Sequence, residues 1–407
     1  MLRLTIVFAL AALTPFQAMS QNRLAGSAAI DAYLQQAVEQ THIPGVVAIV
    51  ADADGLLYTG AFGRQNVAAG IPIAADTIFR IASMTKPVTS VAVVMLIQEG
   101  DVGLDDPIHS YLPAFETEEV IASFNAQDKS YTSRPAARAI TVRHLLTHTS
   151  GLGYGFSNEI LFRLTEGNLG ASATSFPLLH DPGSKWTYGE STRVLGALVE
   201  EVSGQPLEEF MRERIFVPLG MSDTFYTVPP PRHARVATVH RMTEEGLVES
   251  PNPTDVISSP ANGDGGLHST AADYVKFMQM FLSGGRTPDG TRLLSEASVE
   301  LMGQNHTGNV RVELQPAANP ALTRPFPLGA GRDTFGLGFQ ITGAHGDAYA
   351  RSPGSMSWAG IFNTEFWIDP ARGIGAVLLM QYLPFYDETA IETLQGFEQR
   401  VYQSLAD

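Results

Sequence analysis

Phe79-Arg-Ile-Ala-Ser83-Met-Thr-Lys86-Pro-Val88 is the stretch of this sequence that says most about its fold and chemistry. It places a serine hydroxyl and a lysine amine three residues apart, at the expected first turn of a helix. Side chains at i and i+3 of a helix share one face, so the amine can reach the hydroxyl. A lysine held partly out of water loses proton affinity and can act as a base at neutral pH. Ser-x-x-Lys alone is a common pattern, so its interpretation depends on the surrounding sequence.

The residues that follow predict a buried helix. The run Val88–Ile97 is apolar on almost every face, and Gly100 is suited to cap its C-terminus. Pro87 fits only in a first turn, which puts Ser83 at or just before the helix start. Backbone N–H groups and the helix dipole favour negative charge there. Ser83 could be an ordinary N-cap, but a lysine entering a buried helix needs a partner or a function.

The two ends of the chain predict one α+β unit. Short connections such as Asp52-Ala-Asp-Gly55 predict antiparallel neighbours, so strands from both ends are expected in one sheet with helices packed on it. The expected helices are 27–40 and 389–405, and the expected strands are 45–50, 56–62, 335–341, 361–368 and 374–381.

The middle of the chain, about 106–329, has a different pattern. Helical stretches such as 194–202 and 206–214 alternate with Pro- and Gly-rich loops and long irregular segments. Long loops in compact enzymes often form lids or site walls. We therefore expect a mainly helical region inserted into an α/β part made of 25–105 and 330–407, with a cleft between the two.

Residues 1–20 resemble a signal peptide. Arg3 gives the positive start, Leu4–Leu13 is an apolar run too short to span a bilayer, and Ala18-Met-Ser20 supplies small residues for cleavage. Cleavage before Gln21 would leave 21–407 as a periplasmic or secreted protein with no stable membrane insertion. An uncleaved membrane anchor is the alternative interpretation.

Composition narrows the classes of partner. The 407 residues carry a net charge of −16, which disfavours nucleic acid and anionic membrane surfaces as partners. The chain has no cysteine, so it has no disulfide framework, thiolate nucleophile or Cys-ligated metal. Its ten histidines show no metal-ligand spacing, and no metal or other cofactor is expected. The sequence leaves the oligomeric state open.

Four motifs resemble those of the serine β-lactamase-related hydrolases. This superfamily includes class C β-lactamases, D-amino-acid peptidases and family VIII carboxylesterases, and has a fold like that of penicillin-binding proteins. The resemblance runs from about residue 28 to 400, with the motifs in the expected order. They are Phe79–Pro87, Leu145-Leu-Thr-His-Thr-Ser-Gly-Leu152, Trp186-Thr-Tyr188 and Gly265-Gly-Leu-His-Ser-Thr-Ala-Ala-Asp273.

The resemblance implies three catalytic residues. Ser83 would be the acylated nucleophile and Lys86 its activating amine, while Tyr188 would exchange a proton with the serine and the leaving group. A phenolate beside an ammonium has a lowered pKa, so Tyr188 can be a base only next to Lys86. Because the two groups titrate as a coupled pair, the base in each half-reaction stays open.

A further family motif lies on a strand, which carries Lys-Thr-Gly in β-lactamases. Here it reads Ser357-Trp358-Ala-Gly360-Ile361 and has no lysine, which resembles the carboxylesterase branch. The resemblance implies that Ile361 and Ser83 supply the backbone N–H groups of an oxyanion hole. It also places Trp358 and Gly360 at the substrate pocket, although Trp358 could instead be a core aromatic.

Departures from the β-lactamase pattern favour simple esters. The missing lysine removes the cation that would hold a β-lactam carboxylate, and Glu190 stands where β-lactamases carry Asn. We interpret Glu190 as a solvated carboxylate near a helix start, with a proton relay as the alternative. The expected protein is an exported carboxylesterase of short-chain esters. Its expected partners belong to the wider class of small ester or amide substrates. The alternatives are a β-lactamase or D-amino-acid peptidase of the same fold, and a non-catalytic peptide-binding member.

Other motifs have ordinary explanations. Gly189-Glu-Ser191-Thr-Arg193 begins like a nucleophile elbow but lacks the second glycine. We interpret His148 as a structural imidazole bonded in a turn rather than a partner of Ser83. Gly263-Asp-Gly-Gly266 lacks the lysine of a phosphate loop, and Thr270 to Asp273 predicts a helix capping box.

Overall fold

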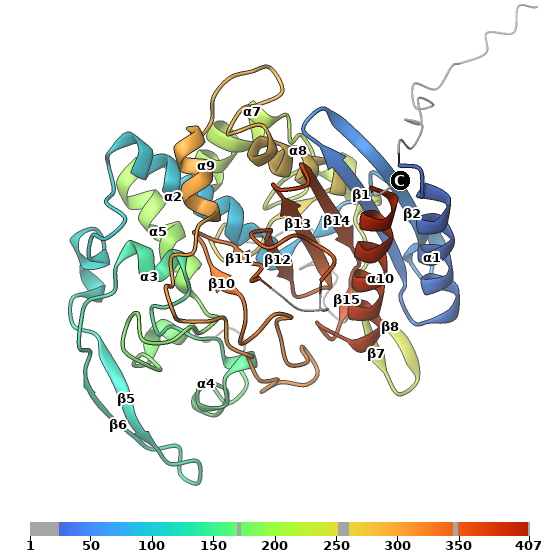
Figure 1. Cartoon of the computed structure of the whole chain (residues 1–407). Helices are drawn as coiled ribbons and strands as arrows, with labels where there is room; N and C mark the ends of the chain where they lie inside the picture. Colours follow the sequence, from blue (N-terminus) through green and yellow to red (C-terminus); the bar gives the residue numbers. More distant parts are fainter. Residues whose placement is uncertain (1–23, 169–171, 251–259, 345–348, 406–407) are drawn as a thin grey trace, which may run out of the picture.

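An eight-stranded antiparallel sheet forms the centre of the molecule (Figure 1). The computed structural model describes residues 24–168, 172–250, 260–344 and 349–405. Strands from the two ends of the chain meet where β1 pairs with β14, with Val47 opposite Leu379, so the expected shared sheet is confirmed. The strand order is β10 (Thr334–Phe335), β11 (Gln340–Ile341), β12 (Met356–Gly360), β13 (Thr364–Asp369), β14 (Ile374–Leu379), β1 (Gly45–Asp52), β2 (Gly55–Asn66) and β3 (Ile71–Pro72).

Helices cover both faces of this sheet. The first and last helices, α1 (Ser27–Gln40) and α10 (Glu388–Ser404), pack together on one face, beside β2 (Figure 1). On the other face α8 (Ala271–Leu282) packs against β1 and β14. Because both faces are covered, the central strands β13 and β14 are buried along their whole length.

Two expected strands differ in detail from the structure. The segment 335–341 forms two short strands, because the chain reverses at Gly338, whose φ of 91° suits glycine alone. A Cβ at Gly338 would also lie 2.3 Å from the Ser90 Oγ. The strand expected from 361 begins only at Thr364, because 361–363 form a hairpin turn with Asn363 at a φ of 59°.

The middle of the chain supplies most of the other elements. Helix α2 (Thr85–Glu99) is almost entirely buried, as its apolar run predicts, and packs against α5 and α6. The α2 helix belongs to the N-terminal part, whereas α8 comes from the middle segment yet forms part of the layer on the sheet. The remaining helices are α3 (Val142–Leu146), α4 (Glu159–Leu164), α5 (Ser191–Ser203), α6 (Leu207–Met211), α7 (Val217–Leu219) and α9 (Glu296–Gly303). The remaining strands are β4 (Phe79–Arg80), β5 (Glu119–Phe124), β6 (Tyr131–Pro135), β7 (His240–Thr243), β8 (Gly246–Glu249), β9 (His268–Ser269) and β15 (Tyr382–Leu383).

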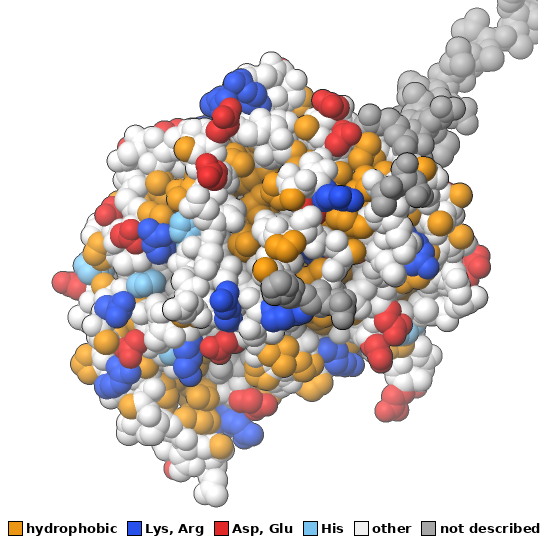
Figure 2. Space-filling view, viewed as in Figure 1, with side chains coloured by type: hydrophobic (Ala, Val, Ile, Leu, Met, Phe, Trp, Pro, Cys, Tyr) orange, Lys and Arg blue, Asp and Glu red, His pale blue; other side chains and the backbone are white. Residues whose placement is uncertain are grey.

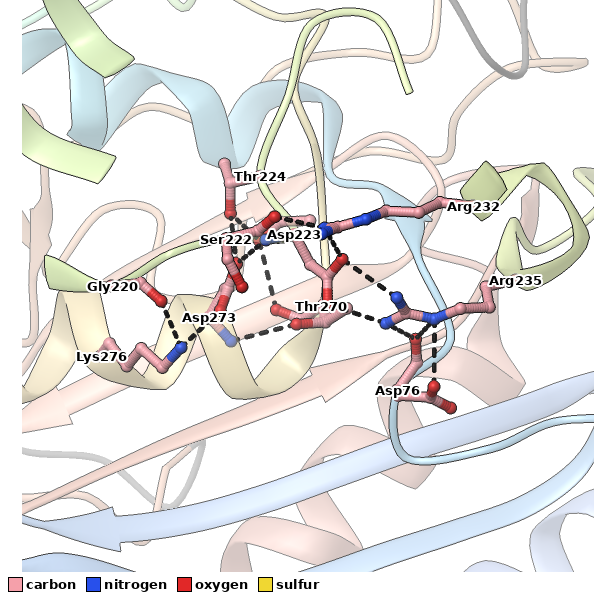
Figure 3. A network of polar contacts seen from close by, with 11 residues as sticks. Asp76, Gly220, Ser222, Asp223, Thr224, Arg232, Arg235, Thr270, Asp273 and Lys276 are labelled. Carbon is pink, nitrogen blue, oxygen red and sulfur yellow. Dashed lines mark hydrogen bonds and ion pairs between the residues drawn. The ribbon is translucent and has the colours of Figure 1, made fainter. Parts of the chain in front are cut away.

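A polar network fixes the start of α8 (Figure 3). The Thr270 side chain accepts a hydrogen bond from the Asp273 N–H at 3.1 Å, which is half of the expected capping box. The Asp273 carboxylate turns elsewhere: it accepts from the Asp223 N–H at 2.6 Å and pairs with Lys276 at 2.8 Å. Asp223 in turn is paired with Arg235 at 2.9 Å. The carboxylate of Asp273 therefore connects α8 to the loop around Asp223, which follows α7 in the chain.

The surface carries both signs of charge. On the face seen in Figure 2, acidic and basic side chains are interspersed rather than gathered in one patch. None of the helices in the described part of the chain has the length and apolar character needed to cross a bilayer. The expected signal peptide and its cleavage position before Gln21 lie outside the described residues.

Candidate active site

Ser83 lies in a tight 3-10 turn, Ala82–Met84, that runs directly into α2. The preceding residue, Ala82, has a φ of 46°, a left-handed conformation that a non-glycine residue adopts only under strain. The Met84 N–H closes the turn by donating to the Ile81 carbonyl at 3.0 Å. As a result, the half-buried Ser83 side chain lines a cavity at the entrance to the buried helix.

Lys86 is buried directly beneath this hydroxyl. Its side chain is 1% exposed, and Nζ donates to the Ser83 Oγ at 3.1 Å and to the Asp264 carbonyl at 2.6 Å. The rings of Tyr154 and Tyr188 have their centroids 5.2 and 4.9 Å from Nζ. Among the described residues no carboxylate forms an ion pair with Lys86. The amine is thus held by a carbonyl and two aromatic faces, with the Ser83 hydroxyl within hydrogen-bond distance.

Tyr188 approaches the same oxygen from the other side. Its hydroxyl donates to the Ser83 Oγ at 2.6 Å, and its ring is buried. The residue precedes α5, and its backbone N–H donates to the Gln315 side chain at 3.2 Å, which helps to fix its position. The structure therefore brings the Lys86 amine and the Tyr188 hydroxyl each within hydrogen-bond distance of the Ser83 Oγ.

A second layer of polar groups surrounds Lys86, and the sequence interpretation missed it. The Tyr154 hydroxyl donates a short hydrogen bond to the Asp264 carboxylate, which also pairs with Arg193 at 3.4 Å. Burial, and then the charge of Asp264, hold the pKa of Tyr154 well above its usual value. The one available signal was Asp264 itself, an acidic residue inside a glycine-rich turn directly before a family motif.

The expectation for Glu190 was wrong. Its side chain is buried, with 3% exposure, rather than solvated. It accepts a hydrogen bond from the Ser172 hydroxyl at 2.6 Å and pairs with Arg193 at 3.4 Å. Arg193 lies three residues further along the chain on α5, so a local ion pair compensates the buried charge.

His148 lies in an aromatic cluster below Tyr188. Its ring is 5.1 Å from that of Tyr188 and 6.2 Å from that of Trp358, centroid to centroid. Burial, and then the charge of Lys86, hold the pKa of His148 well below its usual value, so the imidazole is neutral. Its Nδ1 has no hydrogen-bond partner within the described chain, so the expected bond in a turn does not form at that atom. The His148 ring therefore has a packing role in the aromatic cluster.

The elbow-like segment does not present a nucleophile. Ser191 is the first residue of α5, is fully buried, and exchanges a hydrogen bond with the Ser150 hydroxyl at 2.8 Å. Within the described ranges there is also no group of three or more His, Cys, Asp or Glu side chains that could hold a metal ion.

The end of β12 lies against the turn that carries Ser83. A Cβ at Gly360 would lie 2.3 Å from the Ile81 carbonyl oxygen and 2.3 Å from the Thr364 Oγ1, so only glycine permits this approach. Gly360 itself does not line the cavity, whereas the next residue, Ile361, does. Trp358 lines the cavity with Ser83 and Ile361.

Two cavities meet at this point. The narrower one, about 550 Å³, includes Ser83, Tyr188 and Trp358 and continues below α10. A wider one, about 1340 Å³, lies beside Tyr154 and Arg193. Phe156 and Ile361 line both cavities, so the two adjoin, and Ser83 lines the narrower one.

Comparisons with known proteins identify the family of this chain. A sequence model of the family described as "Beta-lactamase" matches residues 30–398. Esterase EstB of Burkholderia gladioli is 32% identical over 91% of this chain and 92% of its own length. Monacolin J acid methylbutanoyltransferase of Aspergillus terreus is 30% identical over 90% of this chain and 94% of its own length.

A solved structure shows the same fold. The LovD6 mutant of simvastatin synthase from Aspergillus terreus has a TM-score of 0.79 and 29% identity, covering 94% of this chain and 98% of the fungal chain. With the family match over most of the chain, this chain belongs to the β-lactamase family and is a serine hydrolase related to its esterases and acyltransferases.

Proposed function

We propose that this serine hydrolase is a carboxylesterase of short-chain esters that works through an acyl-enzyme on Ser83. The observation that carries the proposal is the position of one oxygen atom. The Ser83 Oγ lies 2.6 Å from the Tyr188 hydroxyl and 3.1 Å from the Lys86 Nζ, and Ser83 lines a cavity. A serine flanked by two proton-exchanging groups is the arrangement that nucleophilic catalysis requires.

The reaction proceeds in two halves. The Lys86–Tyr188 pair accepts the Ser83 proton as Oγ bonds to the ester carbonyl carbon, and backbone N–H groups of Ser83 and Ile361 stabilise the oxyanion. When the C–O bond breaks, the pair returns that proton to the departing alcohol. Water then gives a proton to the pair and attacks the acyl-enzyme, and Ser83 regains its proton as the acid is released.

Two observations favour esters over β-lactams. The strand before Ile361 reads Ser357-Trp358-Ala-Gly360 and offers no lysine for a β-lactam carboxylate. The esterase relative is 32% identical over most of both chains. We therefore expect purified protein to hydrolyse p-nitrophenyl butyrate at least about 100-fold more efficiently than a chromogenic cephalosporin, measured as kcat/KM. Comparable values for the two substrates would overturn this ranking, and failure of fluorophosphonate and β-lactam probes to label Ser83 would support a non-catalytic member.

Acyl transfer is the second candidate, favoured by the wider cavity. Its 1340 Å³ adjoins the Ser83 cavity at Ile361 and can admit an acceptor larger than water. The similarity to a methylbutanoyltransferase points the same way. With p-nitrophenyl butyrate and an added alcohol, acyl transfer would give the butyrate ester of that alcohol. Hydrolysis alone would release the butyryl group only as butyrate.

Export is the last part of the proposal. The apolar run after Arg3 and the small residues before Gln21 motivate it. In a bacterial host, we expect to find the protein outside the cytoplasm, with the mass of a chain that begins at Gln21. A full-length chain retained in the membrane fraction would favour an uncleaved anchor.

A further inference from the structure

Glu365 is a buried carboxyl group that the proposed reaction does not use. It lies on β13, opposite Ala359 of β12, and is 7% exposed. On β13, Trp367 is on the same side and packs against the side of the sheet covered by α1 and α10. Glu365 also lines the narrower cavity that contains Ser83. The carboxyl group therefore stands inside the candidate substrate site, away from the reacting oxygen.

No residue in the described part of the chain hydrogen-bonds to the Glu365 carboxyl. The nearby cation, Arg351, is committed elsewhere, because it pairs with Glu398 at 2.9 Å and both of those side chains are buried. Glu398 also accepts from the backbone N–H groups of Ala350 and Arg351, each at 2.7 Å. The pair cancels its own charge and leaves Glu365 without a dedicated partner. A carboxyl group that lines a cavity without a protein partner can hydrogen-bond to a ligand in that cavity.

The groups around Glu365 keep it uncharged at neutral pH. Burial raises the pKa of Glu365 to about 8; Arg351 opposes this shift and Glu398 adds to it. Tyr349 and Tyr386 also line the cavity, and burial raises the pKa of both phenols, so they stay neutral. The Asp333 carboxylate beyond them accepts from the Gln340 amide at 2.6 Å. Glu365 is then a carboxylic acid whose O–H can donate into the cavity.

The two cavities suggest which part of the substrate meets this acid. The acyl group stays on Ser83 through the second half of the reaction, while the alcohol leaves and water enters. The narrower cavity includes Ser83 and suits the retained acyl chain; the wider one does not include Ser83 and suits the leaving group. Ala359, opposite Glu365, is two residues before Ile361, or about 7 Å along the strand.

We propose that Glu365 closes the acyl cavity with a hydrogen-bonding group and selects acyl chains that carry a hydroxyl or keto oxygen near their far end. The span from Ile361 corresponds to a chain of roughly six atoms. This inference rests on the proposed esterase function for its acyl assignment. It goes further in naming the substrate class: oxygenated medium-length acyl esters, rather than plain alkanoyl esters.

The test compares four p-nitrophenyl esters: those of hexanoic, 6-hydroxyhexanoic and 5-oxohexanoic acid, and that of 6-aminohexanoic acid as a control for a cation site. The natural protein is expected to show a hydroxyhexanoate-to-hexanoate ratio of kcat/KM at least about tenfold higher than Glu365→Leu does, because a site built around a hydrogen bond rejects the analogue that lacks it. Equal ratios in the two proteins would overturn the proposal. A stronger preference for a 6-aminohexanoyl ester would also overturn it, since that would mean a cation site.

The pH dependence gives a second readout. Below about pH 8 the protonated Glu365 can donate a hydrogen bond to the keto oxygen, and above it the carboxylate cannot. The ratio of kcat/KM for the 5-oxohexanoate ester to that for the hexanoate ester should therefore fall as the pH rises through 8. A hydroxyl can donate to the carboxylate, so its ratio should persist. Glu365→Gln keeps a donor at all pH values and should remove the fall, whereas Glu249→Gln, at an exposed carboxylate on β8, should leave it. A fall that persists unchanged in Glu365→Gln would contradict the assignment.

Binding separates this proposal from the proposed function. Calorimetry with Ser83→Ala protein should give methyl 6-hydroxyhexanoate a tighter Kd than methyl hexanoate, and Glu365→Leu added to it should remove the difference. This holds even if no ester is turned over, in which case the esterase proposal fails alone. Equal Kd values in both proteins would reject the cavity assignment. Leu should fold, because it leaves no partner unsatisfied, and thermal unfolding would verify this.

Discussion

Replacing Ser83 with alanine is expected to lower kcat for p-nitrophenyl butyrate by a factor on the order of 10⁵ or more. Alanine removes the one oxygen atom that both Lys86 and Tyr188 contact, so no covalent acyl-enzyme can form. Mass spectrometry should detect an acyl adduct on the natural protein during turnover and none on the variant.

Ser191→Ala is the matched control for this prediction. Ser191 is a buried serine at the start of α5, bonded to Ser150, so its loss should leave turnover nearly unchanged. If Ser83→Ala turned over the ester as fast as the natural protein, the nucleophile would have to be another residue.

Lys86→Met is expected to reduce kcat/KM by roughly 10³- to 10⁴-fold. Methionine has a similar unbranched shape, but it cannot accept the Ser83 proton or donate to the Asp264 carbonyl. Tyr188 would then be the one remaining side chain in hydrogen-bond contact with the Ser83 Oγ among the described residues. Steady-state kinetics from pH 5 to pH 10 would measure the loss, with thermal unfolding as a check on folding.

Lys86→Arg distinguishes a base from a fixed charge. A guanidinium keeps its proton in proteins, so it can supply positive charge but cannot act as a base. We expect this variant to be nearly as inactive as Lys86→Met. Substantial activity in the arginine variant would mean that Lys86 acts only through its charge, and Tyr188 would be the base.

Local patterns made the sheet and the nucleophile predictable. The i to i+3 spacing of Ser83 and Lys86 is decided within one turn, and the buried run after Pro87 specifies its helix without distant contacts. Strands such as β1 and β14 are long enough for their apolar runs to stand out. The reversal at Gly338 was missed because it depends on contacts with Ser90 in another element.

The electrostatics of the site were not predictable in the same way. Lys86 donates to the Asp264 carbonyl, whose residue lies far along the chain, and the Tyr154 hydroxyl reaches the same residue. Glu190 could be placed at a helix start but not recognised as buried, because Ser172 comes from a separate loop. Glu365 reads as part of an ordinary alternating strand until the fold places it in a cavity.

The central position of β1 constrains how this protein can be made. Its hydrogen-bonding edge toward β14 stays open during translation, because that neighbour is encoded near the opposite end of the message. A nascent chain therefore exposes an apolar strand edge until synthesis is nearly complete, and such edges promote aggregation. Pairing over such a sequence distance is also slow. Loss of the last two strands to premature termination would leave β1 without its neighbour, so we expect such fragments to be insoluble or degraded rather than partly active.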